Sequence, residues 1–246
     1  MNPTWQLQTP IEAIIFDCDG TLSAIEGIDE LAKNNGVGEI VSALTAEAMG
    51  KSGITPELYQ QRLDLVYPQQ KQVLELGAQY YTQRTPDADR IIQLFKRLNK
   101  SVYLVSAGLY PAVTLFGELL EIPKTHIYAV DIHFDAQGQF LDFDRSSPLL
   151  HNDGKREIIS QLKNKYQNLL YIGDGLNDFS VHDLVTRFVG YGGVFYRENI
   201  KALCEYYLTA PSLAALLPLA LTAKEVSLLT PNDQRLYEQG SATLTR

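Results

Sequence analysis

The sequence has little of several features that mark particular classes of protein. Its 246 residues include only two cysteines, Cys18 and Cys204, whose wide separation predicts neither a disulfide framework nor a zinc site. The net charge of -8 disfavours a broad surface for nucleic acid. The histidines lack the spacing of metal ligands, so we interpret all four as structural or surface residues: His126, His133, His151 and His182. Internal repeats and low-complexity segments are also missing from the chain.

Long apolar runs are missing as well, and the first residues do not resemble a signal peptide. The apolar stretch LAALLPLAL near the end is too short to span a bilayer, and it contains Pro218. The first ten residues, MNPTWQLQTP, have neither a basic start nor an apolar core, so they do not predict a signal peptide. We therefore expect a cytoplasmic protein with neither a membrane nor a nucleic acid as its partner.

The remaining composition is that of an ordinary globular protein. Hydrophobic residues make up 45% of the chain and charged residues 20%, which is enough apolar material for a substantial core. The length allows one large domain, or one domain that carries a sizeable insertion.

The stretch IIFDCDGT, from Ile14 to Thr21, is the most informative part of the sequence. Its apolar residues stop abruptly at Asp17, which predicts a short buried strand in a parallel sheet. Alternate side chains of a strand share a face, so Asp17 and Asp19 point the same way, at the edge where open α/β sheets bind ligands. Two carboxylates held this close need a positive charge nearby, and Mg²⁺ prefers such oxygen ligands.

Other interpretations of the same stretch remain open. The two aspartates also suit a simple turn at the end of a strand. A calcium loop fits poorly, because Gly20 comes at the fourth loop position and no glutamate closes the loop. Cys18 points to the opposite face and is better interpreted as a small core residue than as a nucleophile.

The segment after this strand predicts a helical insertion. Residues 26–81 contain no convincing strand, and their apolar residues recur at helical spacing in three groups. These groups are Ile28, Leu31 and Ala32; Ile40, Val41, Leu44 and Ala48; and Leu58, Leu63 and Val66. We predict a cap domain over residues 23–81, inserted into a core domain of residues 1–22 and 82–222, where it could fold over the site and exclude water.

Helices and strands alternate again from Pro86 onward. Short strands are predicted at residues 102–105, 169–172, 188–189 and 206–208. Residues 127–131 and 133–141 flank a turn at 135–138, which predicts a β-hairpin. The alternation indicates an α/β fold with a doubly wound parallel sheet and right-handed crossovers. Residues 223–246 are polar, and we expect a C-terminal tail, helical or frayed, outside the core.

Three predicted strands end in groups that suit phosphate and metal chemistry. The groups are Asp17 and Asp19 after the first strand, Ser106 after the second, Asp174 and Asp178 after the third, and Lys155 beyond a nearby turn. Carboxylates hold a cation, while a hydroxyl, backbone N–H groups and an ammonium bind phosphate oxygens. Individually each residue has a structural alternative: Ser106 suits a helix N-cap, and Asp174 and Asp178 suit loop carboxylates or caps. Lys155 suits a structural role less well, because the dipole of a first helical turn disfavours a cation.

Taken in order, the motifs FDCDGT, LVSAG, DGK and GDGLND resemble those of the haloacid dehalogenase superfamily of phosphohydrolases. The resemblance extends over residues 11–217 and implies a Rossmann-like core. Within the superfamily, the runs EGIDELAKNNGV, LTAEAMG, QRLDLVYP and GYGG are similar to the phosphoserine phosphatase branch. The resemblance implies a Mg²⁺-dependent phosphomonoesterase that acts on a small phosphorylated metabolite, most directly L-phosphoserine, as a monomer or homodimer.

The resemblance also implies roles for the carboxylates at the strand ends. Asp17 would be the nucleophile that forms an aspartyl phosphate, and Asp19 would protonate the leaving hydroxyl and then activate water. Mg²⁺ would be held by Asp17, by the backbone carbonyl of Asp19, by Asp174 directly and by Asp178 through water. These roles are chemically sound, because phosphoryl transfer needs an in-line nucleophile and charge stabilisation.

Phosphate binding is implied for a second group of core residues. Ser106, with the N–H of Ala107 or Gly108, would bind phosphate oxygens, and Lys155 would balance the charge between Asp17 and the phosphate.

The cap would supply the substrate-binding residues. Glu26 would meet an ammonium group and Arg62 a carboxylate, while Met49 and Gly50 would line the pocket together with Asn177 of the core. Glu26 also suits an acidic first turn of a helix, and Arg62 suits a solvated helix face.

Four positions depart from the pattern of phosphoserine phosphatases: Gly20, Thr55, Ala107 and Asn177. Thr55 falls where the family generally has a phenylalanine beside the substrate. The phosphatase prediction survives these departures, and the substrate stays open between phosphoserine and another small ester, such as phosphoethanolamine, phosphocholine or a sugar phosphate. A non-catalytic module that binds a phosphorylated metabolite is a remote alternative, because no catalytic group is missing.

Overall fold

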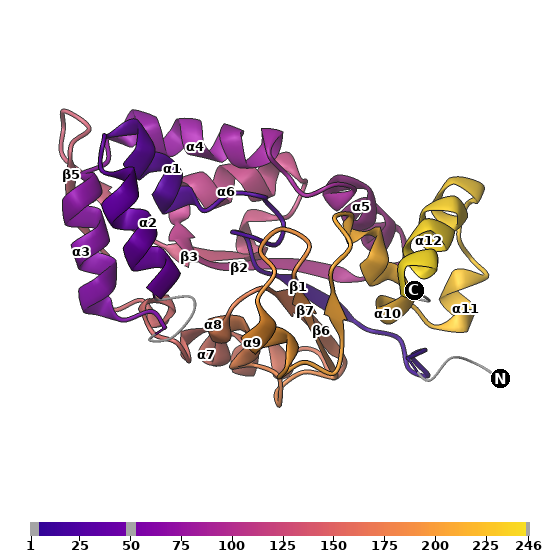
Figure 1. The fold of residues 1–246 in the computed structure, drawn as a ribbon. Helices are drawn as coiled ribbons and strands as arrows, with labels where there is room; N and C mark the ends of the chain where they lie inside the picture. The colour runs from indigo at the N-terminus through magenta and orange to yellow at the C-terminus, as the bar shows by residue number, and fades with distance from the viewer. Residues whose placement is uncertain (1–4, 48–52, 245–246) are drawn as a thin grey trace.

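The computed structural model describes residues 5–47 and 53–244. These residues build a six-stranded parallel sheet in the order β3-β2-β1-β6-β7-β8 (Figure 1). Its strands are β1 (Ala13–Phe16), β2 (Ser101–Leu109), β3 (Ile127–Val130), β6 (Leu169–Gly173), β7 (Arg187–Tyr191) and β8 (Tyr207–Leu208). The predicted α/β fold with a doubly wound parallel sheet is confirmed.

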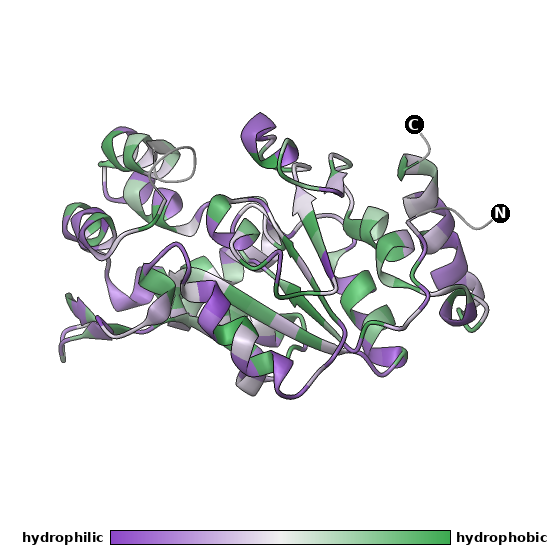
Figure 2. Ribbon diagram, turned by 90° about the horizontal axis from the view of Figure 1, so that it is seen from below, coloured by the Kyte–Doolittle hydropathy of each residue, from purple (hydrophilic) through white to green (hydrophobic). Residues whose placement is uncertain are grey.

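The central strands are apolar because helices cover both faces of the sheet. All four residues of β1 are buried, and Ala13 lies in register with Ser101 of β2 and Leu169 of β6. Figure 2 shows hydrophobic residues concentrated in these strands and in the helix faces that pack on them. The shared register brings the carboxyl ends of β1, β2 and β6 to one edge of the sheet, as the positions of the motifs predict.

Helices connect the strands on both sides. They are α5 (Ala88–Arg97), α6 (Tyr110–Leu119), α7 (Gly154–Lys163), α8 (Leu176–Phe179) and α9 (Glu198–Lys201), and α10 (Leu217–Ala220) follows the last strand. In Figure 1, α5 and α6 lie on one side of the sheet, and α7, α8 and α9 lie on the other. The amphipathic helix α5 buries Ile91, Leu94 and Phe95, and the Phe95 ring lies 6.5 Å from that of Phe16 in β1.

A helical cap follows β1. Its helices are α1 (Gly27–Asn34), α2 (Gly38–Glu47), α3 (Pro56–Val66) and α4 (Gln70–Thr82). The helix α4 runs closely along α6 of the core: a Cβ atom at Gly77 would lie 2.9 Å from the Ala112 carbonyl oxygen. This close helix–helix contact joins the cap to the core, and the exact limits of the two domains stay a prediction.

The predicted hairpin is wrong in its first strand. Residues 127–130 form β3, which pairs in parallel with β2 at the edge of the main sheet, because α6 returns the chain to the end where β2 began. The hairpin consists of β4 (Ile132–Phe134) and β5 (Phe140–Phe143) and packs against α3. The rings of Tyr59 and Phe143 lie 5.1 Å apart, so this part of the predicted core supports the cap.

The C-terminal segment packs against the core more closely than the sequence predicts. It forms α11 (Ala223–Val226) and α12 (Pro231–Leu244), at the end of the molecule opposite the cap (Figure 1). Leu236 is buried, Glu225 pairs with the buried Lys100, and Asp233 accepts a 2.5 Å hydrogen bond from Arg97. Within the described residues, none of the helices has the length and apolar character needed to cross a membrane.

Candidate active site

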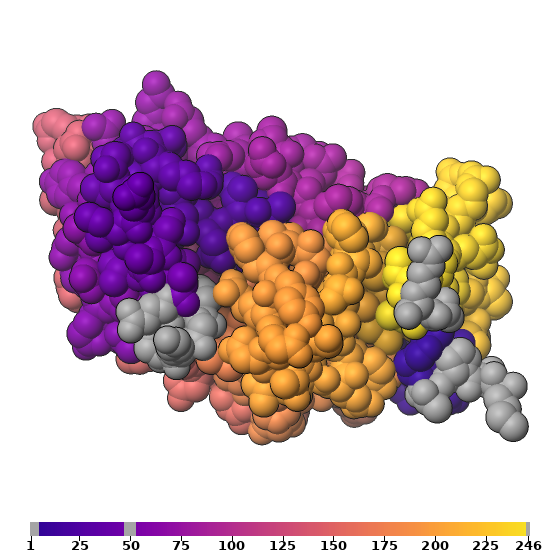
Figure 3. All heavy atoms as spheres, in the orientation of Figure 1, coloured from indigo at the N-terminus to yellow at the C-terminus, as the bar shows by residue number. Residues whose placement is uncertain are grey.

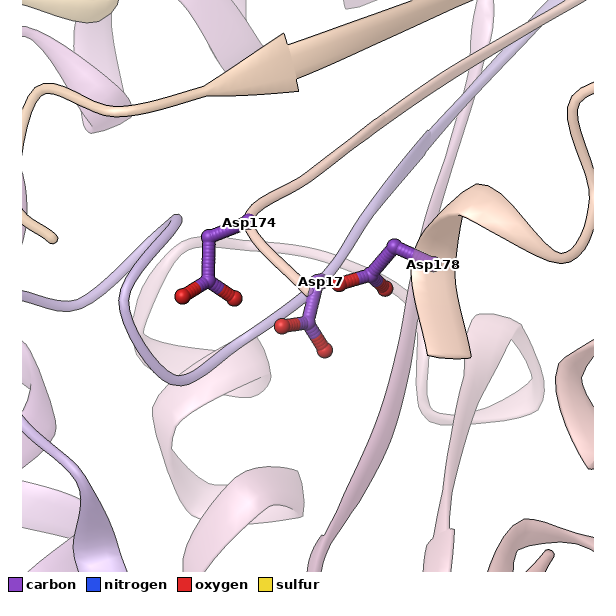
Figure 4. Close-up of side chains that lie close together, drawn as sticks. All are labelled: Asp17, Asp174 and Asp178. Carbon is purple, nitrogen blue, oxygen red and sulfur yellow. The ribbon is translucent and has the colours of Figure 1, made fainter. Parts of the chain in front are cut away.

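Three carboxylates meet where β1 and β6 end. Asp17 directly follows β1, Asp174 directly follows β6, and Asp178 lies in α8. Their side chains point toward one another (Figure 4), and one oxygen of each lies within 4.8 Å of the others. All three residues are buried, so the cluster concentrates negative charge in a poorly hydrated place. Burial and the nearby Asp178 raise the pKa of Asp17 well above its usual range.

Lys155 ties two of these carboxylates together. Its Nζ donates hydrogen bonds of 2.7 Å to Oδ1 of Asp17 and 2.5 Å to Oδ1 of Asp178. Asp178 also accepts from the Tyr171 hydroxyl at 2.8 Å and from the Gly175 N–H at 2.9 Å. Burial works against the charge on Lys155, but Asp17 and Asp178 hold its pKa well above the usual value. The lysine therefore stays charged and fixes the orientation of Asp17.

Arg197, which lies just before α9, is a site residue that the sequence did not indicate. It donates to Oδ2 of Asp174 from Nη2 at 2.9 Å and from Nε at 3.2 Å. The same Nη2 atom lies 3.8 Å from Oε1 of Glu26 at the start of the cap. Burial raises the pKa of Asp174 to about 6, although Arg197 works in the opposite direction. No motif marked this arginine, because it reaches the site only through the loop between β7 and α9.

Asp19 lies apart from the three-carboxylate cluster and is held by the cap. Its Oδ1 atom accepts from the Tyr80 hydroxyl at 2.7 Å and from the Gly27 N–H at 2.6 Å, and Oδ2 accepts from Ser106 at 3.4 Å. Burial raises the pKa of Asp19, and the hydrogen bonds from Tyr80 and Gly27 offset part of this effect. Asp19 therefore keeps its proton to a higher pH than an exposed aspartic acid. Tyr80 was not among the predicted site residues.

The C-terminal part of β2 brings the Ser106 hydroxyl and the backbone of Gly108 close to Asp19. Ser106 is fully buried, and its Oγ accepts a 2.8 Å hydrogen bond from the Gly108 N–H. A Cβ atom at Gly108 would lie only 2.9 Å from Val113 and 3.3 Å from Oδ2 of Asp19. Glycine therefore lets the backbone approach the carboxylates closely, which suits a site for an anion.

One pocket joins the strand ends to the cap. Nine of the predicted site residues line it: Asp17, Asp19, Glu26, Arg62, Ser106, Ala107, Gly108, Asp174 and Asn177. Lys155 and Asp178 are not among the lining residues, but Lys155 hydrogen-bonds to Asp17 and to Asp178. Met49 and Gly50 lie outside the described residues. Figure 3 shows the indigo and purple part of the chain, which contains the cap helices, beside the orange part that follows β6.

The cap end of the pocket contains a buried cation that has no carboxylate partner in the described part of the chain. Arg62, on α3, is 5% exposed, and within the described residues no acidic group lies at ion-pair distance from it. Its Nη1 atom reaches Oγ1 of Thr45 at 3.5 Å, and Thr45 donates to Asp29 at 2.8 Å. Glu26 lies on the same pocket, where burial and then Asp19 raise its pKa well above the usual range.

Three of the departures from the family pattern have local structural roles in this chain. Gly20 has a φ of 69°, and a Cβ atom there would lie 2.8 Å from Asp174 and from Phe195, so only glycine fits. The Thr55 hydroxyl accepts from the Leu58 N–H at 3.2 Å and caps α3. Asn177 lies on the pocket, and its Oδ1 accepts from the N–H of Asp178 at 3.0 Å.

The donors at the strand ends fit a hard divalent cation. Five carboxyl groups crowd around the cations Lys155 and Arg197: Asp17, Asp19, Glu26, Asp174 and Asp178. Among the described residues, no donor reaches Oδ2 of Asp17 or Oδ1 of Asp174. An all-oxygen set with unused acceptors and excess negative charge is what Mg²⁺ prefers.

Comparison with known proteins defines the class to which this fold and site belong. A family model for haloacid dehalogenase-like hydrolases matches residues 11–181. The chain therefore belongs to the haloacid dehalogenase-like hydrolases, as the motifs predict.

Within this family, the chain is similar to phosphoserine phosphatases in both sequence and structure. The chain is 34% identical to the phosphoserine phosphatase of Bos taurus over 200 residues, which cover 80% of this chain and 89% of that protein. Among solved structures, a phosphoserine phosphohydrolase-like protein from Francisella tularensis subsp. tularensis SCHU S4 has a TM-score of 0.76 at 24% identity, covering 86% and 100% of the two chains. A phospho-aspartyl intermediate analogue of phosphoserine phosphatase has a TM-score of 0.75 at 23% identity, covering 85% and 98%. The chain is a phosphatase of the haloacid dehalogenase-like family, and it shares the fold of these two solved structures.

Proposed function

We propose that this phosphatase is Mg²⁺-dependent and hydrolyses L-phosphoserine to L-serine and phosphate through an aspartyl phosphate on Asp17. The observation that carries this proposal is Arg62, a buried cation without a carboxylate partner among the described residues, on the same pocket as Asp17. A buried charge is costly unless it is paired, so an anionic group of the substrate is the natural partner.

The pocket offers a complement to each charged group of phosphoserine. The phosphate belongs at the strand ends beside Asp17 and Ser106, the carboxylate belongs at Arg62, and the ammonium belongs at Glu26. Phosphoethanolamine and phosphocholine have no carboxylate for Arg62, and a sugar phosphate has neither an ammonium nor a carboxylate. The alternatives therefore leave at least one buried charge of the pocket uncompensated.

Asp17 and Asp19 divide the chemistry between them. An oxygen of Asp17 attacks phosphorus in line, the bond to the serine oxygen breaks, and Asp19 gives its proton to that oxygen. Asp19 then takes a proton from water, whose oxygen attacks the aspartyl phosphate, breaks its bond to phosphorus and regenerates Asp17. The raised pKa of Asp19 suits the first step, because an acid must hold its proton near neutral pH.

Positive and neutral donors assist this exchange. Ser106 and the N–H groups of Ala107 and Gly108 bind the phosphate oxygens, and Lys155 orients Asp17 through its 2.7 Å hydrogen bond. Asp17, Asp174 and Asp178, together with the carbonyl of Asp19, would hold Mg²⁺. When bound there, the cation supplies charge neutralisation for the phosphoryl group.

The proposal is tested by measuring phosphate release from a panel of esters. The panel contains L- and D-phosphoserine, phosphothreonine, phosphoethanolamine, phosphocholine, a sugar phosphate and an aryl phosphate. Each is assayed with Mg²⁺ and with chelator, for the wild type and for Asp17→Asn. Preference for L-phosphoserine that is lost in both controls supports the proposal. Metal-dependent turnover of another ester would retain the mechanism and overturn the substrate.

A monomer or homodimer in the cytoplasm stays the prediction made from the sequence.

A further inference from the structure

Tyr59 carries a buried hydroxyl group that the proposed chemistry leaves unused. The residue lies on α3 and is 4% exposed, and its hydroxyl has no hydrogen-bond partner within the described residues. It lines the pocket that contains Arg62 and Asp17. Buried hydroxyl groups are nearly always hydrogen-bonded, so an unpaired one on a residue that lines a ligand pocket indicates a partner that arrives with the ligand.

The position of this hydroxyl is fixed by packing. Tyr59 and Arg62 are three residues apart on one helix and therefore share a face. The guanidinium carbon of Arg62 lies 5.7 Å from the centre of the Tyr59 ring, and Phe143 of the hairpin packs on the same ring at 5.1 Å. The ring is thus held between the cap cation and β5, and its hydroxyl cannot turn to solvent.

Arg62 itself has unused hydrogen-bonding capacity beside this ring. Its Nε atom is buried without a partner among the described residues, and Nη1 makes only the long 3.5 Å contact to Thr45. The cap end of the pocket therefore presents several unmet donors in one place. Burial raises the pKa of Tyr59 above its usual value, although Arg62 works in the opposite direction, so the phenol keeps its proton and can donate.

We propose that the Tyr59 hydroxyl donates a hydrogen bond to the substrate carboxylate beside Arg62, which makes Tyr59 a specificity-determining residue. This inference rests on the proposed function, since it needs a substrate that carries a carboxylate. Of the charged groups of phosphoserine, an ammonium cannot accept, and the phosphate is taken by the donors around Ser106. A carboxylate has two oxygens with about four acceptor positions, enough for both Arg62 and Tyr59.

The variant Tyr59→Phe tests the inference with little change in packing, because the ring on Phe143 is kept. We expect kcat/KM for L-phosphoserine to fall about 10- to 100-fold, the effect of losing a hydrogen bond to a charged group. Turnover of phosphoethanolamine, which has no carboxylate, should change less than about twofold. The matched control is Tyr67→Phe on the adjacent C-cap, whose side chain is 53% exposed and should affect neither substrate.

A binding measurement without metal or turnover gives an independent readout. L-serine and ethanolamine are added to metal-free protein, and the shift in melting temperature is recorded. The wild type should be stabilised more by L-serine, and Tyr59→Phe should lose this difference while its own melting temperature stays equal or rises. A purely structural role would lower the melting temperature of the variant and affect both ligands alike.

The possible failures are distinguishable because the wild type is assayed first. If the wild type does not prefer L-phosphoserine, both the proposed function and the proposed role of Tyr59 are overturned. If the wild type prefers L-phosphoserine and the Tyr59→Phe variant keeps this preference, only the proposed role of Tyr59 is overturned. An equal loss on both esters also contradicts that role.

Discussion

Tyr80 of the cap donates a 2.7 Å hydrogen bond to Asp19, which follows the first strand of the core. The Tyr80 ring stacks on Phe116 of α6 at 5.6 Å, so the same side chain both joins α4 to the core and holds the proposed acid. Placement of the cap and orientation of Asp19 are therefore coupled. A rotation of α4 would move a partner of the group that has to exchange the proton.

The first prediction concerns this hydrogen bond. Replacing Tyr80 by phenylalanine keeps the stacked ring and removes the donor that stabilises the charged form of Asp19, so the pKa of Asp19 should rise further. We expect kcat to fall about tenfold, with little change in KM, and the alkaline limb of the kcat profile to move to higher pH. A pH–rate profile measures this, with Tyr81→Phe on the same helix as control. A limb that stays in place would contradict the coupling.

A second prediction separates the function of Arg62 from its contribution to stability. In Arg62→Met, kcat/KM for L-phosphoserine should fall by about 10²- to 10³-fold, and that for phosphoethanolamine much less, since only the former has a carboxylate. Because the cation is buried without an acidic partner among the described residues, the free energy of unfolding should stay equal or increase. Kinetics on both esters and urea unfolding test this. Equal kinetic losses on both esters would reject the amino-acid substrate.

A third prediction is that removing Arg197 lowers the stability of the metal-free protein and strengthens its binding of Mg²⁺. In Arg197→Gln, Asp174 loses a cationic partner, so the metal-free protein should lose roughly 1–3 kcal/mol, less than a fully buried pair because Arg197 is partly exposed. The same loss makes the carboxylate cluster more negative, so its affinity for Mg²⁺ should rise severalfold. Urea unfolding with chelator and a Mg²⁺ titration by calorimetry measure the two effects. Weaker Mg²⁺ binding would contradict this prediction, because it would show that Arg197 positions Asp174 for the cation and does not compete with the cation for that carboxylate.

A fourth prediction follows from the raised pKa of Asp174. Its pKa is about 6 in the folded metal-free protein against an ordinary 3.8, so the folded state binds the proton more tightly. The contribution of Asp174 to stability is therefore full below about pH 4 and is lost as the pH rises through about 6, on the order of 2–3 kcal/mol.

The measurement compares unfolding of the wild type and Asp174→Asn in chelator between pH 4 and 7. The wild type should lose stability relative to the variant as the pH rises, and Mg²⁺ at pH 7 should restore it by binding the folded state. Parallel curves for the two proteins would mean that burial does not perturb this carboxyl group as described.

Much of the site's location was determined by the sequence alone. The apolar run that stops at Asp17, and the similar runs before Ser106 and Asp174, predicted strands whose carboxyl ends carry the polar groups. Parallel strands in register place those ends at one edge, and the structure has them there. The fold class and the family could therefore be predicted, because strand period, the alternation of strands with helices and motif spacing can be read from the chain itself.

Tertiary structure alone decided which side chains complete that edge. The hairpin prediction was wrong because residues 127–130 suit either of two partners, and only the crossover through α6 selects β2. Tyr59, Tyr80 and Arg197 carried no sequence signal, since helical spacing shows which residues share a face but not what that face meets. Their contacts depend on how the cap and the loop after β7 pack over the strand ends. That packing is set by burial of side chains from segments far apart in the chain.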